Sequence, residues 1–198
     1  MNEKTALDEL QFIRKIIEDS KKTVLDNGIE YIMWGIIVVV GLFTTNILIN
    51  MEIKFNYLWV WVFLIGLGWT FSIVSSLKKK NKMPRTLGQR LISTVWLSVG
   101  IGMTLLGFVG PASGAYRGVF VSPILAVLLG IAFFISGFIY DLKWMKLIPF
   151  GWWIGAIVMF IYPGMHSFII MGSLMILFQI IPGIILYRKF KQEAEVKP

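Results

Sequence analysis

The sequence predicts an all-α integral membrane protein with six transmembrane helices in a compact bundle, on the basis of three observations. Of the 198 residues, 57% are hydrophobic and 15% are charged, whereas soluble domains average roughly 45–50% and 25%. The apolar residues form long blocks, most of them close to the about 20 residues that a helix needs to cross a bilayer core of about 30 Å. Basic residues gather between alternate blocks, which is typical of multi-pass proteins.

The first 28 residues form a polar segment that we expect to be a cytoplasmic amphipathic helix. At 100° per residue, apolar side chains cover one face and most charges cover the other. Asn27-Gly28 is expected to end this helix, because Gly adopts the left-handed conformation readily. Two uses of the apolar face are open: contact with the membrane or the bundle, and self-association or binding of a partner protein. The segment is too polar for a secretory signal, so we expect Met1 to begin the mature chain.

Six apolar blocks follow, and each is expected to be one transmembrane helix. The stretch 110–118, rich in Gly, Pro and Ser, is expected to be a flexible link. Pro182 is expected to kink the last helix. Residues 188–198 are expected to form a basic cytoplasmic tail. The predicted spans are 31–49, 57–77, 91–109, 119–140, 147–162 and 165–187.

The basic residues determine the predicted orientation, because Lys and Arg resist transfer across the membrane. With six spans, all basic residues except Lys54 and Arg117 fall on the same side. Both termini are therefore predicted to be cytoplasmic, and the compact chain without a signal peptide favours the inner (plasma) membrane of a bacterium. The loop that sets this topology lies between the second and third spans. Its basic residues are Lys78, Lys79, Lys80, Lys82, Arg85 and Arg90.

The tryptophans have two open interpretations. Trp34, Trp96 and Trp153 each lie close to a Gly near the predicted cytoplasmic ends of the odd-numbered spans. Either the chain consists of three repeated helical hairpins, or these residues belong to the aromatic belt that forms at membrane interfaces.

Small residues recur at four-residue steps in several spans. Helices in lipid associate largely through close packing, so we expect these residues to face other helices. The alternative is that their hydroxyl groups line a solute path. The set is Gly68, Ser72, Ser76, Ser98, Gly102, Ala126, Gly130, Gly151 and Gly155.

Few polar side chains lie within the predicted spans. None of them is ionisable at mid-depth, where transport proteins commonly place such a group. Asn46 and Gln179 are the deepest amides, and we expect them either to form hydrogen bonds between helices or to line a polar path. His166, the only histidine, is expected at the outer mouth, either as an ordinary interfacial residue or as a pH-sensitive site.

Residue types also exclude several classes of function. The chain has no Cys, which excludes disulfides, thiolate metal sites and thiol catalysis. It has no phosphate-binding Gly loop, metal motif or Ser nucleophile elbow, so no enzyme, cofactor or metal site is expected. The net charge of +8 lies beside the apolar blocks, where topology explains it, and nucleic acid is not an expected partner.

Residues 152–191 resemble part of the six-helix acid-resistance membrane family in their Gly, turn Pro and short basic ends, but the Gly spacing does not continue into the first hairpin. We therefore assign no family. The leading prediction is a non-catalytic protein that acts by protein interaction or regulation at the bilayer. Its partner would be a membrane or cytoplasmic protein, or another copy of the chain. The alternative is a small transporter or channel for a neutral or hydrophobic solute, working alone or as an oligomer.

Overall fold

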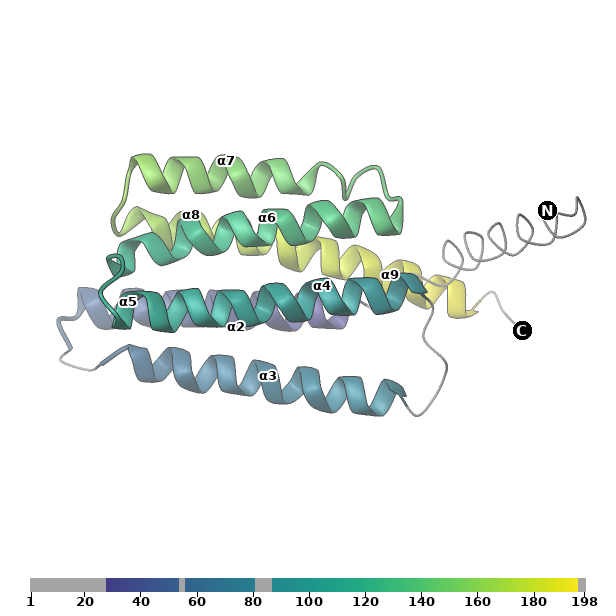
Figure 1. Ribbon diagram of the computed structural model, residues 1–198, viewed down its shortest axis with the longest axis horizontal. Helices are drawn as coiled ribbons and strands as arrows, with labels where there is room; N and C mark the ends of the chain where they lie inside the picture. Colours follow the sequence, from purple (N-terminus) through teal and green to yellow (C-terminus); the bar gives the residue numbers. More distant parts are fainter. Residues whose placement is uncertain (1–27, 54–55, 81–86, 196–198) are drawn as a thin grey trace, which may run out of the picture.

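The computed structural model describes residues 28–53, 56–80 and 87–195. Within these ranges the chain is helical and has no strands, which confirms the all-α fold class. The long helices lie side by side with their axes nearly parallel (Figure 1). The helices are α2 (Ile29–Asn50), α3 (Leu58–Lys80), α4 (Leu87–Thr104), α5 (Gly110–Ala112), α6 (Val121–Tyr140), α7 (Ile148–Ile161), α8 (His166–Met175) and α9 (Ile181–Glu195), with the π-helical segments η1 (Leu105–Val109) and η3 (Ile176–Ile180) and the 3-10 turn η2 (Gly118–Phe120).

The predicted spans correspond to these helices with one difference in length. Five helical stretches of the described chain are long and apolar enough to cross a membrane. The predicted span 147–162 is α7, which has 14 residues and is therefore about 21 Å long, shorter than a bilayer core of about 30 Å. The five long stretches are Ile29–Asn50, Leu58–Lys78, Gly88–Ala112, Gly118–Tyr140 and His166–Gln192.

The link predicted at 110–118 starts later than expected, because α5 continues the helix to Ala112. In η1 the Gly110 N–H donates to the carbonyl of Leu105, five residues back. In the same register the Leu106 carbonyl would need an N–H from Pro111, which has none. The Tyr116 hydroxyl donates to that carbonyl instead, so the link is anchored to the helix that it follows.

The last span also differs from the prediction near its end. Just before Pro182, where a kink was expected, the helix contains the π-helical segment η3, in which the Ile181 N–H donates to the Ile176 carbonyl five residues back. Beyond this segment α9 runs to Glu195. The predicted basic tail at 188–198 is therefore helical as far as the structure describes it. The predicted amphipathic helix lies outside the described residues, apart from Gly28, whose φ of 66° confirms the expected left-handed conformation.

The core lies between α2, α6, α7 and α8. Trp152 of α7 is fully buried, and its ring stacks on Phe133 of α6 with 6.3 Å between centroids. Phe133 also contacts the ring of Tyr31 from α2. By contrast, the α3 span and the span that begins with α4 each bury only 6% of their apolar stretch. The α6 span buries 33% of its apolar stretch and the α8–α9 span 39%. The helices α3 and α4 are therefore the less tightly packed part.

Basic residues gather at one end of the helices. The N-terminal ends of α2, α4 and α7 and the C-terminal ends of α3, α6 and α9 all lie at this end, on the right in Figure 1. Within the described ranges, every basic residue except Arg117 lies near it. We call this the basic end.

Candidate functional site

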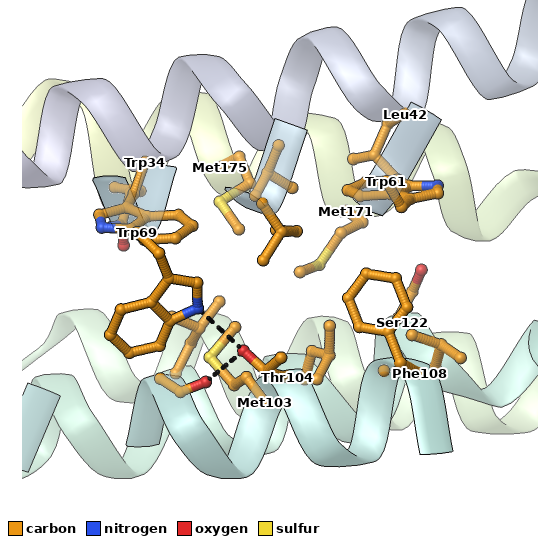
Figure 2. Close-up of a pocket in the computed structure, with 18 of the residues that line it drawn as sticks. Trp34, Leu42, Trp61, Trp69, Met103, Thr104, Phe108, Ser122, Met171 and Met175 are labelled. Atoms are coloured by element: carbon orange, nitrogen blue, oxygen red, sulfur yellow. Dashed lines mark hydrogen bonds between the residues drawn. The ribbon is translucent and has the colours of Figure 1, made fainter. Parts of the chain in front are cut away.

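A cavity of about 1400 Å³ lies between α2, α3, α4, α6 and α8. Its middle is lined by apolar side chains that face one another from two sides, with Leu42, Met171 and Met175 opposite Met103 and Phe108 (Figure 2). Pockets for drug-sized ligands measure roughly 300–1,000 Å³. This cavity is larger, and it is long enough to accept an extended molecule.

The cavity reaches the surface between α3 and α4. Ile73 and Leu77 of α3 and Leu97 of α4 belong to its wall and are also exposed large hydrophobic residues. The backbone of α3 packs closely along α2 but not along α4. An apolar molecule therefore has a lateral route into the cavity between these two helices.

Tryptophan side chains connect the helices around the cavity. Trp34 of α2 covers Gly68 of α3, where an added Cβ would lie 2.6 Å from the indole ring. Its Nε1 donates to the hydroxyl of Ser72, one turn further along α3, at 3.0 Å. We call this arrangement, a small residue with Ser or Thr four residues later, a Trp notch. It fits an indole because the small residue admits the ring and the hydroxyl accepts its N–H.

A second tryptophan joins the same two helices, and this one extends from α3 to α2. Trp61 of α3 covers Gly41 of α2, where an added Cβ would lie 2.8 Å from its ring. Its Nε1 donates to the Thr45 hydroxyl at 3.1 Å. Each of the two helices thus supplies one tryptophan and one Trp notch, which explains the close packing of α2 and α3.

A third Trp notch links α3 to α4 beside the lateral opening. Trp69 of α3 lies against Gly100, and its Nε1 donates to the Thr104 hydroxyl at 3.2 Å. Thr104 in turn donates to the Gly100 carbonyl at 2.8 Å (dashed lines in Figure 2). The hydroxyl therefore uses its proton within α4 and accepts the indole N–H from α3.

The fourth tryptophan of the cavity wall joins α4 to α6. Trp96 donates from Nε1 to the Ser136 hydroxyl at 3.1 Å, four residues after the small residue Ala132. Its ring meets Tyr31 edge-on, with 5.0 Å between centroids. The α2, α4 and α6 helices thus meet at this aromatic cluster, which closes one side of the cavity.

Two buried polar atoms on the wall have no hydrogen-bond partner among the described residues. They are Oε1 of Gln179 and Oγ of Ser167, in side chains that are each 3% exposed. Leaving such a group unpaired costs about 1–3 kcal/mol. Gln179 lies in η3, and π-helical segments often occur at functional sites. Both atoms are themselves fully buried, so a bound molecule reaches them only when their side chains turn toward the cavity.

Charged residues of the described wall lie only near its two ends. Glu30 belongs to the basic end, where its carboxylate accepts a hydrogen bond from the Ser75 hydroxyl at 3.4 Å. Arg117 lies at the opposite end. The middle of the cavity is therefore electrically neutral.

The predicted pair of amides is not brought together. Gln179 lies on the cavity wall, but Asn46 does not; its Oδ1 accepts a hydrogen bond from Asn50 at 2.5 Å. His166 is exposed at the start of α8. Of the two predicted polar-path residues, the structure therefore places only Gln179 at the cavity.

The predicted small residues fall into three groups. Gly68, Ser72 and Ser76 lie on the cavity side of α3. The second group lies under side chains of neighbouring helices or is fully buried. The third group is not packed: Ser98 is exposed, and Gly102 has no atom within 4 Å of an added Cβ. The packed group comprises Gly130 under Trp153, Gly151 under Phe178, Gly155 under Leu174, and Ala126 at 0% exposure.

The predicted topology-setting loop is described only in part. Lys78 and Arg90 are exposed at the basic end. Lys79 and Lys80 belong to the last turn of α3, and Lys82 and Arg85 lie outside the described residues.

Sequence reasoning did not identify four tryptophans as cavity residues, and it noted two of them, Trp34 and Trp96, only for their place beside a Gly. The four are Trp34, Trp61, Trp69 and Trp96. A signal for them is present, since Gly or Ala precedes Ser or Thr by four residues on each helix that receives an indole. The sequence does not state which tryptophan enters which Trp notch. No group of three or more His, Asp or Glu side chains that would hold a metal ion occurs in the described parts of the chain.

Comparisons with protein-family models, with characterised proteins and with solved structures gave no match. The cavity itself is therefore the feature of this chain that points to a function.

Proposed function

We propose that this chain is a multi-pass membrane protein that binds a neutral or hydrophobic solute in the cavity, as the binding step of a small transporter or channel. The observation that carries the proposal is the apolar cavity of about 1400 Å³ with its lateral opening. The neutral middle of the wall favours solutes without a charge, because burying an unpaired charge is costly.

The cavity opens between α3 and α4, so molecules from the surroundings can fill it. Water fills such a space poorly, since a buried water needs two to four polar partners. An apolar molecule, either a lipid chain or a dedicated solute, is the occupant that the wall favours.

The exposed surface supports placement in a bilayer. Large apolar side chains such as Phe43, Phe63 and Ile154 are exposed on the outside of the helices, and soluble monomers rarely expose extended apolar surface. Although α7 is short, it runs from the basic end to the opposite end (Figure 1). We therefore propose that α7 is the sixth helix to cross the bilayer. With the basic end cytoplasmic, both termini face the cytoplasm of a bacterium.

The leading prediction from the sequence, interaction or regulation through the N-terminal segment, remains a prediction. Of residues 1–28 only Gly28 is described. The predicted partners and the predicted oligomer likewise remain predictions.

Photolabelling tests the proposal directly. The protein in lipid nanodiscs is irradiated with a neutral alkyl diazirine, with and without excess unlabelled alkyl chain, and labelled residues are mapped by mass spectrometry. We expect competed labelling at Met103, Met171 and Met175, and labelling that is not competed at the outward residues Phe63 and Ile154. If the three wall residues are unlabelled, or their labelling is not competed, the cavity is not a binding site.

A matched pair of variants sharpens this experiment. Gly107 lies on the cavity wall, whereas Gly102 does not, and neither has an atom within 4 Å of an added Cβ. Gly107→Phe therefore adds a ring at the cavity wall with no clash at its Cβ, and Gly102→Phe adds the same ring elsewhere. We expect Gly107→Phe to weaken competed labelling at least severalfold and Gly102→Phe to leave it unchanged. Equal labelling of both variants contradicts the proposal.

A further inference from the structure

The cavity wall offers a bound molecule one buried amide. Gln179 is 3% exposed, its Oε1 has no partner among the described residues, and its side chain lies against Gly35 of α2. The rest of the wall around the middle of the cavity is mainly aromatic and apolar, and the hydroxyls of Thr45, Ser72 and Thr104 already accept indole N–H groups there. The oxygen is itself fully buried, so a ligand reaches it once the amide turns toward the cavity. A hydrogen-bonding group on the ligand would then satisfy an atom that the fold leaves unpaired.

A hydroxyl group is the best complement to this amide. An amide has an accepting oxygen and a donating nitrogen, and a hydroxyl group both donates and accepts. It therefore pairs with Gln179 in either orientation of the amide, which structures seldom distinguish. An ether or a hydrocarbon of the same length cannot donate to Oε1.

An anionic head group does not suit this position. The described wall has one basic side chain, Arg117, and it lies at the opposite end of the cavity from Glu30. Glu30 is five residues before Gly35 on α2, which is about 7.5 Å along the helix. A carboxylate beside Gln179 would thus lie near another carboxylate and far from a cation, which disfavours its charged form.

The remainder of the ligand is defined by the wall between the two buried polar atoms. Ser167 lies twelve residues before Gln179 on α8 and η3, which corresponds to about 18 Å of helix. Between these positions the cavity presents Met171, Met175 and Phe168. This length of apolar wall fits an extended alkyl chain, which enters from the bilayer between α3 and α4.

We propose that the solute is a neutral long-chain amphiphile whose hydroxyl group pairs with the Gln179 amide and whose alkyl chain lies along the apolar wall. This inference rests on the proposed function, because it names the class of solute that the cavity binds. It assigns selection for the head group to Gln179 and binding of the chain to the methionine and aromatic side chains.

Competition between two matched probes tests the inference. 1-Dodecanol and dodecyl methyl ether have the same chain, but only the alcohol donates a hydrogen bond. Each is titrated against the alkyl diazirine on the intact protein in nanodiscs, with the concentrations in the membrane measured. We expect the alcohol to compete about three- to tenfold better, which is the range of a single net hydrogen bond.

Variants assign the preference to one residue. Gln179→Met keeps an unbranched side chain of similar size without the amide, so it should abolish the preference for alcohol and leave competition by the ether unchanged. Asn46→Leu removes an amide away from the wall and should keep the preference. The comparison of alcohol with ether on the unmodified protein stands even if Gln179→Met fails to fold.

The outcomes separate this inference from the proposed function. If both probes compete equally on the unmodified protein, the cavity binds chains but Gln179 does not select the head group, and the inference is wrong. Stronger competition by dodecanoate or dodecylamine than by dodecanol also overturns it. If no probe competes, the proposed function itself fails.

Discussion

Replacing Gly28 by Ala is expected to destabilise the fold strongly, for two separable reasons. Gly28 has φ of 66°, where an L residue other than Gly costs about 1–2 kcal/mol. An added Cβ would also lie 2.2 Å from the Gly183 carbonyl oxygen and 2.9 Å from the Tyr187 backbone nitrogen. These are backbone atoms of α9, so relief requires that α2 and α9 move apart, and such overpacking costs about 1–3 kcal/mol. The expected total is roughly 2–5 kcal/mol.

Two control substitutions isolate the two terms. Gly114 has φ of 75° and no atom within 4 Å of an added Cβ, so Gly114→Ala carries only the conformational cost of about 1–2 kcal/mol. Gly183 has no positive φ, but an added Cβ would lie 2.8 Å from Ile32 and 2.9 Å from Tyr31. Gly183→Ala therefore carries the packing cost of about 1–3 kcal/mol, from which the better helix propensity of Ala subtracts up to about 1 kcal/mol.

The free energy of unfolding measures all three variants in one assay. Each protein in mild detergent is titrated with a denaturing detergent, and the transition is followed by far-ultraviolet circular dichroism and tryptophan fluorescence. We expect the loss for Gly28→Ala to exceed the loss for Gly114→Ala by at least 1 kcal/mol. Equal losses for these two variants would refute the reasoning, because the contact between α2 and α9 would then add nothing.

Three further predictions concern other parts of the chain. Trp61→Phe removes an indole hydrogen bond to a buried hydroxyl and should lower the free energy of unfolding by about 1–2 kcal/mol, whereas Trp59→Phe, at a position 64% exposed, should change it by less than about 0.5 kcal/mol. A topology reporter fused after Lys82 or at either terminus should read cytoplasm, and one near Ser113 should read the outside; a cytoplasmic reading there would contradict six spans. Burial raises the pKa of Tyr116 above its ordinary value of 10.0. The stability that the protonated hydroxyl contributes is therefore complete below pH 10 and is lost as the pH rises through the folded-state pKa. Tyr116→Phe should remove this alkaline loss of stability in unfolding measurements.

The long helices were predictable because the apolar blocks of the sequence are long and are separated by short polar stretches. The span predicted at 31–49 is Ile29–Asn50 in the structure, and the span predicted at 119–140 ends at Tyr140 in both. The end of α9 at Glu195 was not predictable from hydropathy, since a helix keeps its backbone hydrogen bonds where its side chains become polar. Likewise, η1 allows Pro111 to follow a helix without ending it.

The site was predictable only in its components. The small residues at four-residue steps and the tryptophans are visible in the sequence, but their pairing depends on how the helices are placed. Trp34, Trp96 and Trp153 have a role in the structure that neither interpretation of the sequence included, because each donates its indole N–H to a neighbouring helix. The cavity could not be predicted, since its volume is a property of the distances between helices and not of any one helix.

The position of the cavity follows from the unequal packing of the two parts of the protein. The spans containing α6 and α8–α9 bury 33% and 39% of their apolar stretch, against 6% for the α3 and α4 spans. Large aromatic rings such as Phe133 and Trp152 fill the space between α6 and α7. Between α3 and α4 the described contact is the indole of Trp69 on Gly100 and Thr104. Motions that cost the least free energy occur where the fewest buried contacts are lost. Separation of α3 from α4 is therefore the lowest-cost way to widen the cavity, and the hydrogen bond between Trp69 and Thr104 lies directly on that path.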